Sequence, residues 1–227
     1  MLLHANATLR IRAALAGTGI ELVASCDIAD YDARAPEGLR SASWVPRARG
    51  LVVAASAGPW LWRAFRARVA KDPALARLEH PYDAFVSEQL GRADAALAAA
   101  GVRFQRFEAA FLAPIPVDFV ALAQLVGLGS PGPFALAIHP EHGAWWALRG
   151  AWIVDAEVEP ATGLEPPCSN CPAPCVGGWA NAGGIAQATA EARGRCVIGQ
   201  GSRYDDDQLA YHDRRAAEMI PPQKSGS

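Results

Sequence analysis

Four of the five cysteines fall close together, in the pattern Cys168-x2-Cys171-x3-Cys175 with Cys196 further along the chain. Four thiolates suit a [4Fe–4S] cluster or a structural zinc ion. The spacing differs from the Cys-x2-Cys-x2-Cys-x3-Cys-Pro run of ferredoxins, while prolines at 166, 167, 172 and 174 restrict the backbone and could preset a ligand loop. We expect the four cysteines to act together on one [4Fe–4S] cluster. Zinc, or reduced thiols without a metal, are the alternatives.

A second candidate site is the segment IHPEHGAWWALRG at 138–150, which contains His139. In a strand, Trp145 and Arg149 share one face and Trp146 lies on the other. An aromatic plane with a cation beside it suits a flat ligand that carries amides and a phosphate, since Arg binds phosphate through two parallel hydrogen bonds. The alternative is that both tryptophans belong to the core and Arg149 pairs with a carboxylate.

The glycines Gly127, Gly129 and Gly132 form a G-x-G-x-x-G pattern just before this segment. A dinucleotide site needs a strand before the glycines and a helix after them. Here we expect a helix before and a strand after. The pattern therefore indicates a loop that needs positive φ or close backbone packing.

Periodicity and breaker residues predict an α+β chain. We expect helices at 6–15, 59–71, 81–101, 116–127 and from about 205 onward. We expect strands at 21–26, 51–56, 102–108, 134–139, 144–149 and 151–156, with a loop over 27–49. The last three strands are expected to be joined by tight turns and to pair antiparallel. A Pro-rich connector at 159–167 separates a predicted α+β domain, 1–160, from a cysteine-containing C-terminal cap and tail, 161–227.

Composition narrows the function classes. Charged residues make up 19% of the chain, the net charge is −2, and no long run of Lys or Arg occurs, so we expect no nucleic-acid partner. No apolar run reaches the length of a membrane span, and the first residues lack the layout of a signal peptide. We therefore expect a cytoplasmic protein with reduced thiols, in which Cys26 is an ordinary buried cysteine.

Several segments together resemble a known family. Gly127-Leu128-Gly129 followed by ALAIHPEHGAWWALRGAW resembles the cblC-type cobalamin-trafficking proteins and the related corrinoid-binding domain of epoxyqueuosine reductases and reductive dehalogenases. The helix segment PYDAFVSEQLGRADAAL and the segment SRYDDDQLAYHDRRAAE, in which Tyr204 precedes an acidic helix start, are similar to the cblC pattern. The cysteines are more similar to those of the epoxyqueuosine reductases.

The resemblance implies a nitroreductase-like fold, an antiparallel sheet with flanking helices, that holds cobalamin base-off beside residues 127–149. The cofactor-binding residues it implies are Gly127, Gly129, His139, Trp145, Trp146, Arg149 and Tyr204. The function it implies is cobalamin binding and reductive removal of the upper axial ligand, with reduced flavin or a thiol as electron donor. An electron-donor protein or a B12-acceptor protein would be the macromolecular partner.

The chain departs from the epoxyqueuosine reductase pattern in two ways. The reductase carries an acidic proton donor where this chain has Ala113 within FLAPIPVDF, and only enough cysteines for one cluster are present. Epoxyqueuosine reduction is therefore not expected. The alternatives are a single-cluster iron–sulfur oxidoreductase that passes electrons to cobalt, and a non-catalytic corrinoid carrier.

Overall fold

The fold was analysed in a computed structural model, which describes residues 6–109, 118–132, 136–161, 164–180 and 185–219. Its centre is an antiparallel sheet of four strands in the order β1 (Leu22–Asp27), β2 (Gly50–Ala57), β6 (Trp146–Val154) and β3 (Phe104–Glu108). The two central strands are apolar and are buried along most of their length. This architecture confirms the predicted α+β class.

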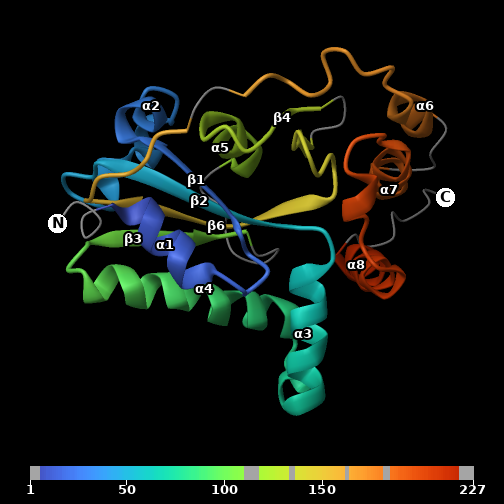
Figure 1. Cartoon of the computed structure of the whole chain (residues 1–227), viewed down its shortest axis with the longest axis horizontal. Helices are drawn as coiled ribbons and strands as arrows, with labels where there is room; N and C mark the ends of the chain where they lie inside the picture. The colour runs from blue at the N-terminus through green and yellow to red at the C-terminus, as the bar shows by residue number, and fades with distance from the viewer. Residues whose placement is uncertain (1–5, 110–117, 133–135, 162–163, 181–184, 220–227) are drawn as a thin grey trace, which may run out of the picture.

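Helices cover both faces of the sheet (Figure 1). On one face, α1 (Ala7–Leu15), α3 (Trp60–Lys71) and α4 (Pro81–Ala99) enclose a core that includes Val52 and Trp152. On the other face, α2 (Ile28–Asp32) and α5 (Phe119–Leu125) pack over Leu51 and Ile153. The alternation of Leu51 and Val52 between the two cores is the two-residue period of a strand buried on both sides.

The C-terminal helices stack at one end of the sheet, on the right of Figure 1. They are α6 (Cys175–Ala180), α7 (Ile185–Arg195) and α8 (Asp206–Met219). A two-stranded sheet of β4 (Ser130–Pro131) and β5 (Ala137–Ile138) lies between this group and α5. Short 3-10 turns complete the chain: η2 (Glu37–Leu39), η3 (Ser41–Ser43), η4 (Leu75–Arg77) and η5 (Gln200–Ser202).

Two sequence-based expectations about the elements were wrong. Residues 27–49 are not a plain loop, because Asp27 caps the short helix α2 by accepting a hydrogen bond from the Ala29 amide. The predicted strands at 144–149 and 151–156 are one strand, β6, which passes straight through Gly150. Gly150 is a packing residue, since a Cβ there would lie 3.1 Å from Leu90 of α4.

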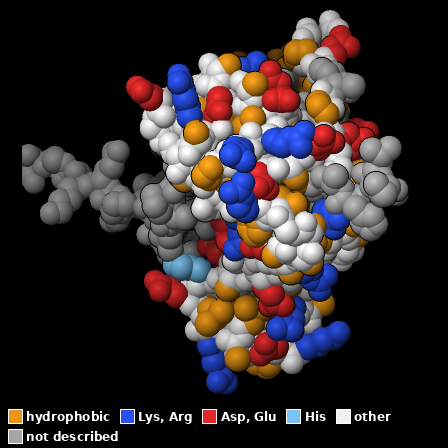
Figure 2. Space-filling view, turned by 90° about the vertical axis from the view of Figure 1, so that its left-hand side faces the viewer, with side chains coloured by type: hydrophobic (Ala, Val, Ile, Leu, Met, Phe, Trp, Pro, Cys, Tyr) orange, Lys and Arg blue, Asp and Glu red, His pale blue; other side chains and the backbone are white. Residues whose placement is uncertain are grey.

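The division of the chain at residue 160 stays a prediction. Residues just before it pack on the four-stranded sheet with α1 to α5, which we call the sheet domain. Ser25 of β1 donates a hydrogen bond to the carbonyl of Glu159 at 2.5 Å. Among the described helices, none is long and apolar enough to cross a membrane. The face shown in Figure 2 carries acidic and basic side chains intermixed.

Candidate functional site

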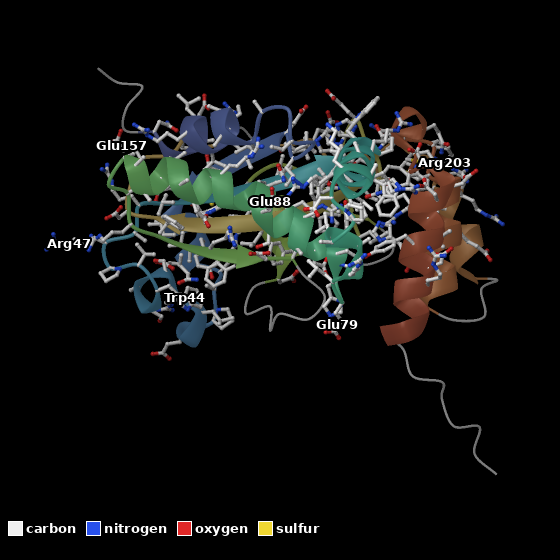
Figure 3. The ribbon with its side chains drawn as sticks, turned by 90° about the horizontal axis from the view of Figure 1, so that it is seen from below. Trp44, Arg47, Glu79, Glu88, Glu157 and Arg203 are labelled. Carbon is white, nitrogen blue, oxygen red and sulfur yellow. The ribbon has the colours of Figure 1, made fainter. Side chains whose placement is uncertain are left out.

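Six aromatic side chains meet where the C-terminal helices contact the sheet domain. This aromatic box consists of Trp62, Tyr82, Trp145, Tyr204, Tyr211 and His212. Ring centroids lie 5.5 Å apart for Trp145 and Tyr204, 6.0 Å for Tyr204 and His212, and 5.0 Å for Trp62 and Tyr211. Figure 3 shows side chains crowded at this end of the molecule, where Arg203 is labelled, opposite Arg47 and Glu157.

Three helices position four of the six rings of the box, while Trp145 lies just before β6 and Tyr204 just before α8. Trp62 comes from α3 and Tyr82 from the first turn of α4, where Pro81 starts the helix. Helix α8 contributes Tyr211 and His212, which share a face with the buried Gln208 at spacings of three and four residues. The inward face of α8 therefore forms one wall, and the two long helices of the sheet domain form the other.

A β-bulge directs Arg149 into this site. In the pairing of β2 with β6, Ala54 faces Gly150 but Ala55 faces Leu148, so Arg149 is the extra residue. Its Nε donates to the Ser56 hydroxyl at 2.8 Å and its Nη2 to the Tyr82 hydroxyl at 3.2 Å. Among the described residues, no carboxylate forms an ion pair with Arg149. Within the described part of the chain, the hydrogen bonds of the Arg149 guanidinium are therefore to two hydroxyl groups, and it shares a small pocket with Asp83 and Glu108.

Two titratable groups of the box, His212 and Tyr82, are held neutral. Burial, followed by the charges of Arg149 and Arg193, lowers the pKa of His212 to about 4. Burial raises the pKa of Tyr82 to about 12. At neutral pH the site therefore presents two guanidinium groups, a neutral imidazole and a phenol that keeps its proton.

Several buried polar atoms at this end have no hydrogen-bond partner among the described residues. They are Trp62 Nε1, Trp145 Nε1, Arg193 Nε and Gln208 Oε1. Three of the four are donors, and an unpaired buried donor costs about 1–3 kcal/mol. Their arrangement suits a ligand rich in oxygen acceptors.

Arg193 connects the aromatic box to a second site. Its guanidinium carbon lies 5.8 Å from the centre of Trp145 and 5.5 Å from that of Tyr204. The same residue lines an apolar pocket that contains Cys168, Cys171, Cys175 and Cys196. We call this the cysteine pocket. The structure therefore brings the four predicted cysteines to one place, adjacent to the aromatic box.

The loop of the cysteine pocket has a strained backbone. Ala173 adopts φ 51°, although it carries a side chain, and it stands between Pro172 and Pro174. This conformation turns the Ala173 amide toward Cys171, whose sulfur accepts its hydrogen bond at 3.4 Å. Amide donors to sulfur stabilise a thiolate. The strain thus supports a preset position for the sulfur of Cys171.

Two of the four cysteines, Cys168 and Cys175, have a raised pKa in this arrangement. Burial, and then the neighbouring thiols, raise the pKa of Cys168. Burial also raises the pKa of Cys175, against the lowering effect of backbone hydrogen bonds. Within the described parts of the chain, no three His, Cys, Asp or Glu side chains form a group that could hold a metal ion. The sulfurs are therefore gathered around one pocket but not closed around a single ion.

Backbone contacts attach the cysteine pocket to the turn that precedes Trp145. A Cβ on Gly143 would lie 2.0 Å from the Ile198 carbonyl oxygen, and one on Gly199 would lie 2.1 Å from the His142 carbonyl. Both glycines have positive φ, 56° and 74°. His142 Nδ1 and the Ser202 hydroxyl form a 2.8 Å hydrogen bond beside them. The segment after Cys196 and the turn at 139–143 therefore lie backbone against backbone.

The other residues predicted for the site are not among the six rings of the aromatic box. Trp146 is part of the core against α5, and its Nε1 donates to the Ala137 carbonyl at 2.8 Å. A Cβ on Gly129 would lie 2.7 Å from the Trp146 ring, and Gly127 has φ 71° at the end of α5. These glycines serve packing and backbone conformation, as the sequence pattern indicated.

His139 stabilises its own turn. Its Nδ1 accepts hydrogen bonds from the amides of Glu141 at 3.1 Å and His142 at 3.3 Å. Burial, and then His142, lower its pKa to about 4, so the ring is neutral. One of its two ring nitrogens is thereby occupied by the backbone.

The sequence analysis thus identified Trp145 and Tyr204 of the box, and Arg149 beside it. It missed the other four rings, Trp62, Tyr82, Tyr211 and His212, and the neighbouring Arg193. From the sequence, Trp62 and His212 could be assigned only to predicted helices, and no pattern pointed to Arg193 as a site residue. Their recognition required knowing that α3, α7 and α8 meet. Ala113, which occupies the expected position of the reductase acid, lies outside the described residues.

Comparisons with known proteins were made by sequence and by structure. No protein-family model matches the sequence, and no curated protein sequence matches it. Among solved structures, the C. elegans B12-trafficking protein CblC, a human MMACHC homologue, matches with a TM-score of 0.64 at 15% identity. That match covers 93% of this chain and 92% of the worm protein.

Epoxyqueuosine reductases share the same fold less closely. The enzyme from Streptococcus thermophilus matches with a TM-score of 0.53 at 18% identity, over 83% of this chain and 56% of the enzyme. The one from Bacillus subtilis matches with a TM-score of 0.50 at 15% identity, over 74% and 50%. This chain therefore spans about half the length of these reductases. At these identities the comparisons confirm the likeness in fold that the sequence segments predicted.

Proposed function

We propose that this protein binds a cobalamin-type corrinoid at the aromatic box and processes it by reductive removal of the upper axial ligand. The observation that carries the proposal is the box itself, an aromatic site with two arginines and unpaired donors. Such a site suits a flat macrocycle fringed with amide oxygens and a phosphate. The shared fold with a B12-trafficking protein supports this ligand over other flat molecules.

Each described residue of the site has a proposed role. Trp145 and Tyr204 provide apolar surface against the corrin, while Arg149 donates hydrogen bonds to a phosphate or amide oxygen. Arg193 and the indole N–H groups donate to further amide oxygens. Bound base-off, the corrinoid supplies the redox chemistry at cobalt, and the protein orients it and excludes water. Gly127, Gly129, His139 and Trp146 support the turn and core next to this surface.

Titration with aquocobalamin tests the proposal directly. The absorbance of the corrin should shift to the base-off position with saturable binding, and isothermal calorimetry should report heat at the same stoichiometry. The variant Trp145→Ala should weaken the spectral change, whereas Trp44→Ala, on the opposite side of the sheet domain, should leave it intact. Absence of both the shift and the heat for the unmodified protein would refute corrinoid binding.

We further propose that the cysteine pocket holds one [4Fe–4S] cluster through Cys168, Cys171, Cys175 and Cys196. The pocket brings the four sulfurs together at apolar walls, although the described residues include no group of three His, Cys, Asp or Glu side chains that could hold a metal ion. A cluster is wider than an ion and joins sulfurs that stand further apart. Anaerobically purified protein should be brown and contain about four irons and four sulfides per chain. Colourless protein with one zinc per chain would replace the cluster by a structural ion.

Two related functions are separated from this one by simple assays. Turnover of cyanocobalamin with reduced flavin or a thiol distinguishes a processing enzyme from a non-catalytic corrinoid carrier. Reduction of bound corrinoid by a pre-reduced cluster, without added flavin or thiol, would indicate a single-cluster oxidoreductase. Either outcome is compatible with a cytoplasmic location and with delivery of the corrinoid to an acceptor protein, both of which remain predictions.

A further inference from the structure

Helix α8 covers the aromatic box through polar anchors and ring contacts. Arg63 of α3 makes two parallel hydrogen bonds to Asp205, at 2.8 and 2.7 Å, and Arg66 pairs with Asp207. These four side chains are partly exposed. The remaining contacts on its inner face include those of Tyr211 and His212 with Trp62. The helix is therefore anchored at its start by ion pairs that water and salt can reach.

The buried side of α8 is incompletely satisfied. Gln208 is 1% exposed, yet its Oε1 has no partner among the described residues, and Trp62 Nε1 beneath the helix also lacks one. His212, on the same helix, is kept neutral because burial and then the charges of Arg149 and Arg193 lower its pKa. Unpaired polar atoms lower the free energy gained when the helix docks. Without a ligand, α8 is therefore held less tightly than its aromatic contacts alone would hold it.

We propose that α8 is a lid that opens to admit the ligand of the aromatic box and is held shut by the pairs Arg63–Asp205 and Arg66–Asp207. The chain segment before it, from Gly199 with φ 74° to Arg203, connects the lid to the rest of the protein. The identity of the ligand as a corrinoid rests on the proposed function. The lid itself rests on the contacts of α8.

Hydrogen exchange on the full-length protein without ligand tests the lid. In the variant Arg63→Gln/Arg66→Gln, amides of residues 208–214 should exchange about fivefold faster than in wild type, equal to about 1 kcal/mol. Raising NaCl from 0.05 to 0.5 M should accelerate the same amides in wild type but not in the variant. Arg68→Gln is the matched control, because Arg68 pairs with Asp72 and Glu88 and not with α8. It should exchange as wild type does.

Equal exchange in the double variant and wild type, with no effect of salt, would overturn the lid. Stopped-flow mixing with aquocobalamin tests the route of entry. Association with the double variant should be several-fold faster than with wild type or Arg68→Gln. If all three associate equally fast, the ligand does not enter under α8 and the proposal is wrong. If wild type binds no cobalamin, the proposed function fails, while the exchange result still decides whether α8 opens.

Discussion

Backbone geometry fixes where the side chains of Trp145, Trp146 and Arg149 lie. Trp145 and Trp146 are neighbours in the sequence and both are buried, yet Trp145 packs among the rings of the aromatic box and Trp146 in the core beneath α5. Strand alternation predicted that separation. It did not predict that Arg149 lies at a bulge and reaches the Tyr82 hydroxyl, since a bulge depends on the register with β2.

The first prediction concerns Arg149. Replacing it with Ala should weaken cobalamin binding by roughly 1–3 kcal/mol, the scale of a lost charge-assisted hydrogen bond. Arg149→Lys should recover only part of the lost binding free energy, because an ammonium group cannot reproduce a planar fork with parallel donors. Calorimetric titration measures both, with the exposed Arg47→Ala at the opposite end as control. If a folded Arg149→Ala protein binds cobalamin normally, the Arg149 side chain serves only as a structural support for Tyr82.

The second prediction concerns the cysteines. Cys171→Ser should abolish the iron content and colour of anaerobic protein, while circular dichroism of the sheet domain stays near that of wild type. Cys26→Ala is the matched control. Burial raises the pKa of Cys26 to about 12, so it stays a thiol within β1 and should not affect iron. Retention of full iron in Cys171→Ser would exclude this sulfur as a ligand.

At the scale of elements, the sequence predicted the helices with clear breakers and failed where tertiary pairing decides. Pro81 and the periodic apolar face of the following residues predicted α4 almost to its ends. Gly150 was interpreted as a turn because glycine usually interrupts strands, whereas here its lack of a side chain makes room for Leu90. The meeting of α3, α7 and α8 could not be predicted, because it depends on how the connections run.

The third prediction tests the contact between the turn at 139–143 and the segment after Cys196. Gly199→Ala should lower the free energy of unfolding by roughly 1–3 kcal/mol, since a Cβ there meets the His142 carbonyl and φ is positive. It should also weaken retention of iron by moving Cys196. Gly201→Ala, two residues later, is the control, because its Cβ would meet no atom within 4 Å. If both variants unfold at similar temperatures, the contact between the two segments does not contribute to stability.

At the scale of the whole molecule, the sequence indicated the fold class and a likeness to corrin-binding proteins, and the structure adds how stability depends on pH. His139 and His212 both have a pKa lowered to about 4, first by burial, from an ordinary value of 6.5. Between these values the unfolded chain binds protons that the folded chain does not. Stability is therefore full above about pH 6.5 and is lost as the pH falls toward 4.

The fourth prediction follows from that difference in proton binding. Urea unfolding at pH 7, 6 and 5 should show a free energy that falls by up to about 1.4 kcal/mol per pH unit for each histidine. His212→Gln should remove the contribution of His212 to this dependence of the unfolding free energy on pH. His139→Gln should remove the contribution of His139, and it should also lower stability at every pH because the hydrogen bonds of the His139 side chain to its turn are lost. Carboxylates contribute mainly below this window, because their unfolded pKa values are near 4. Since burial and then the charges of Arg149 and Arg193 lower the pKa of His212 on α8, acid should also loosen the lid. Hydrogen exchange of residues 208–214 should then rise at pH 5 more in wild type than in His212→Gln. An unchanged slope in His212→Gln would mean that this imidazole reaches water without unfolding, and that the box is more open than its contacts indicate.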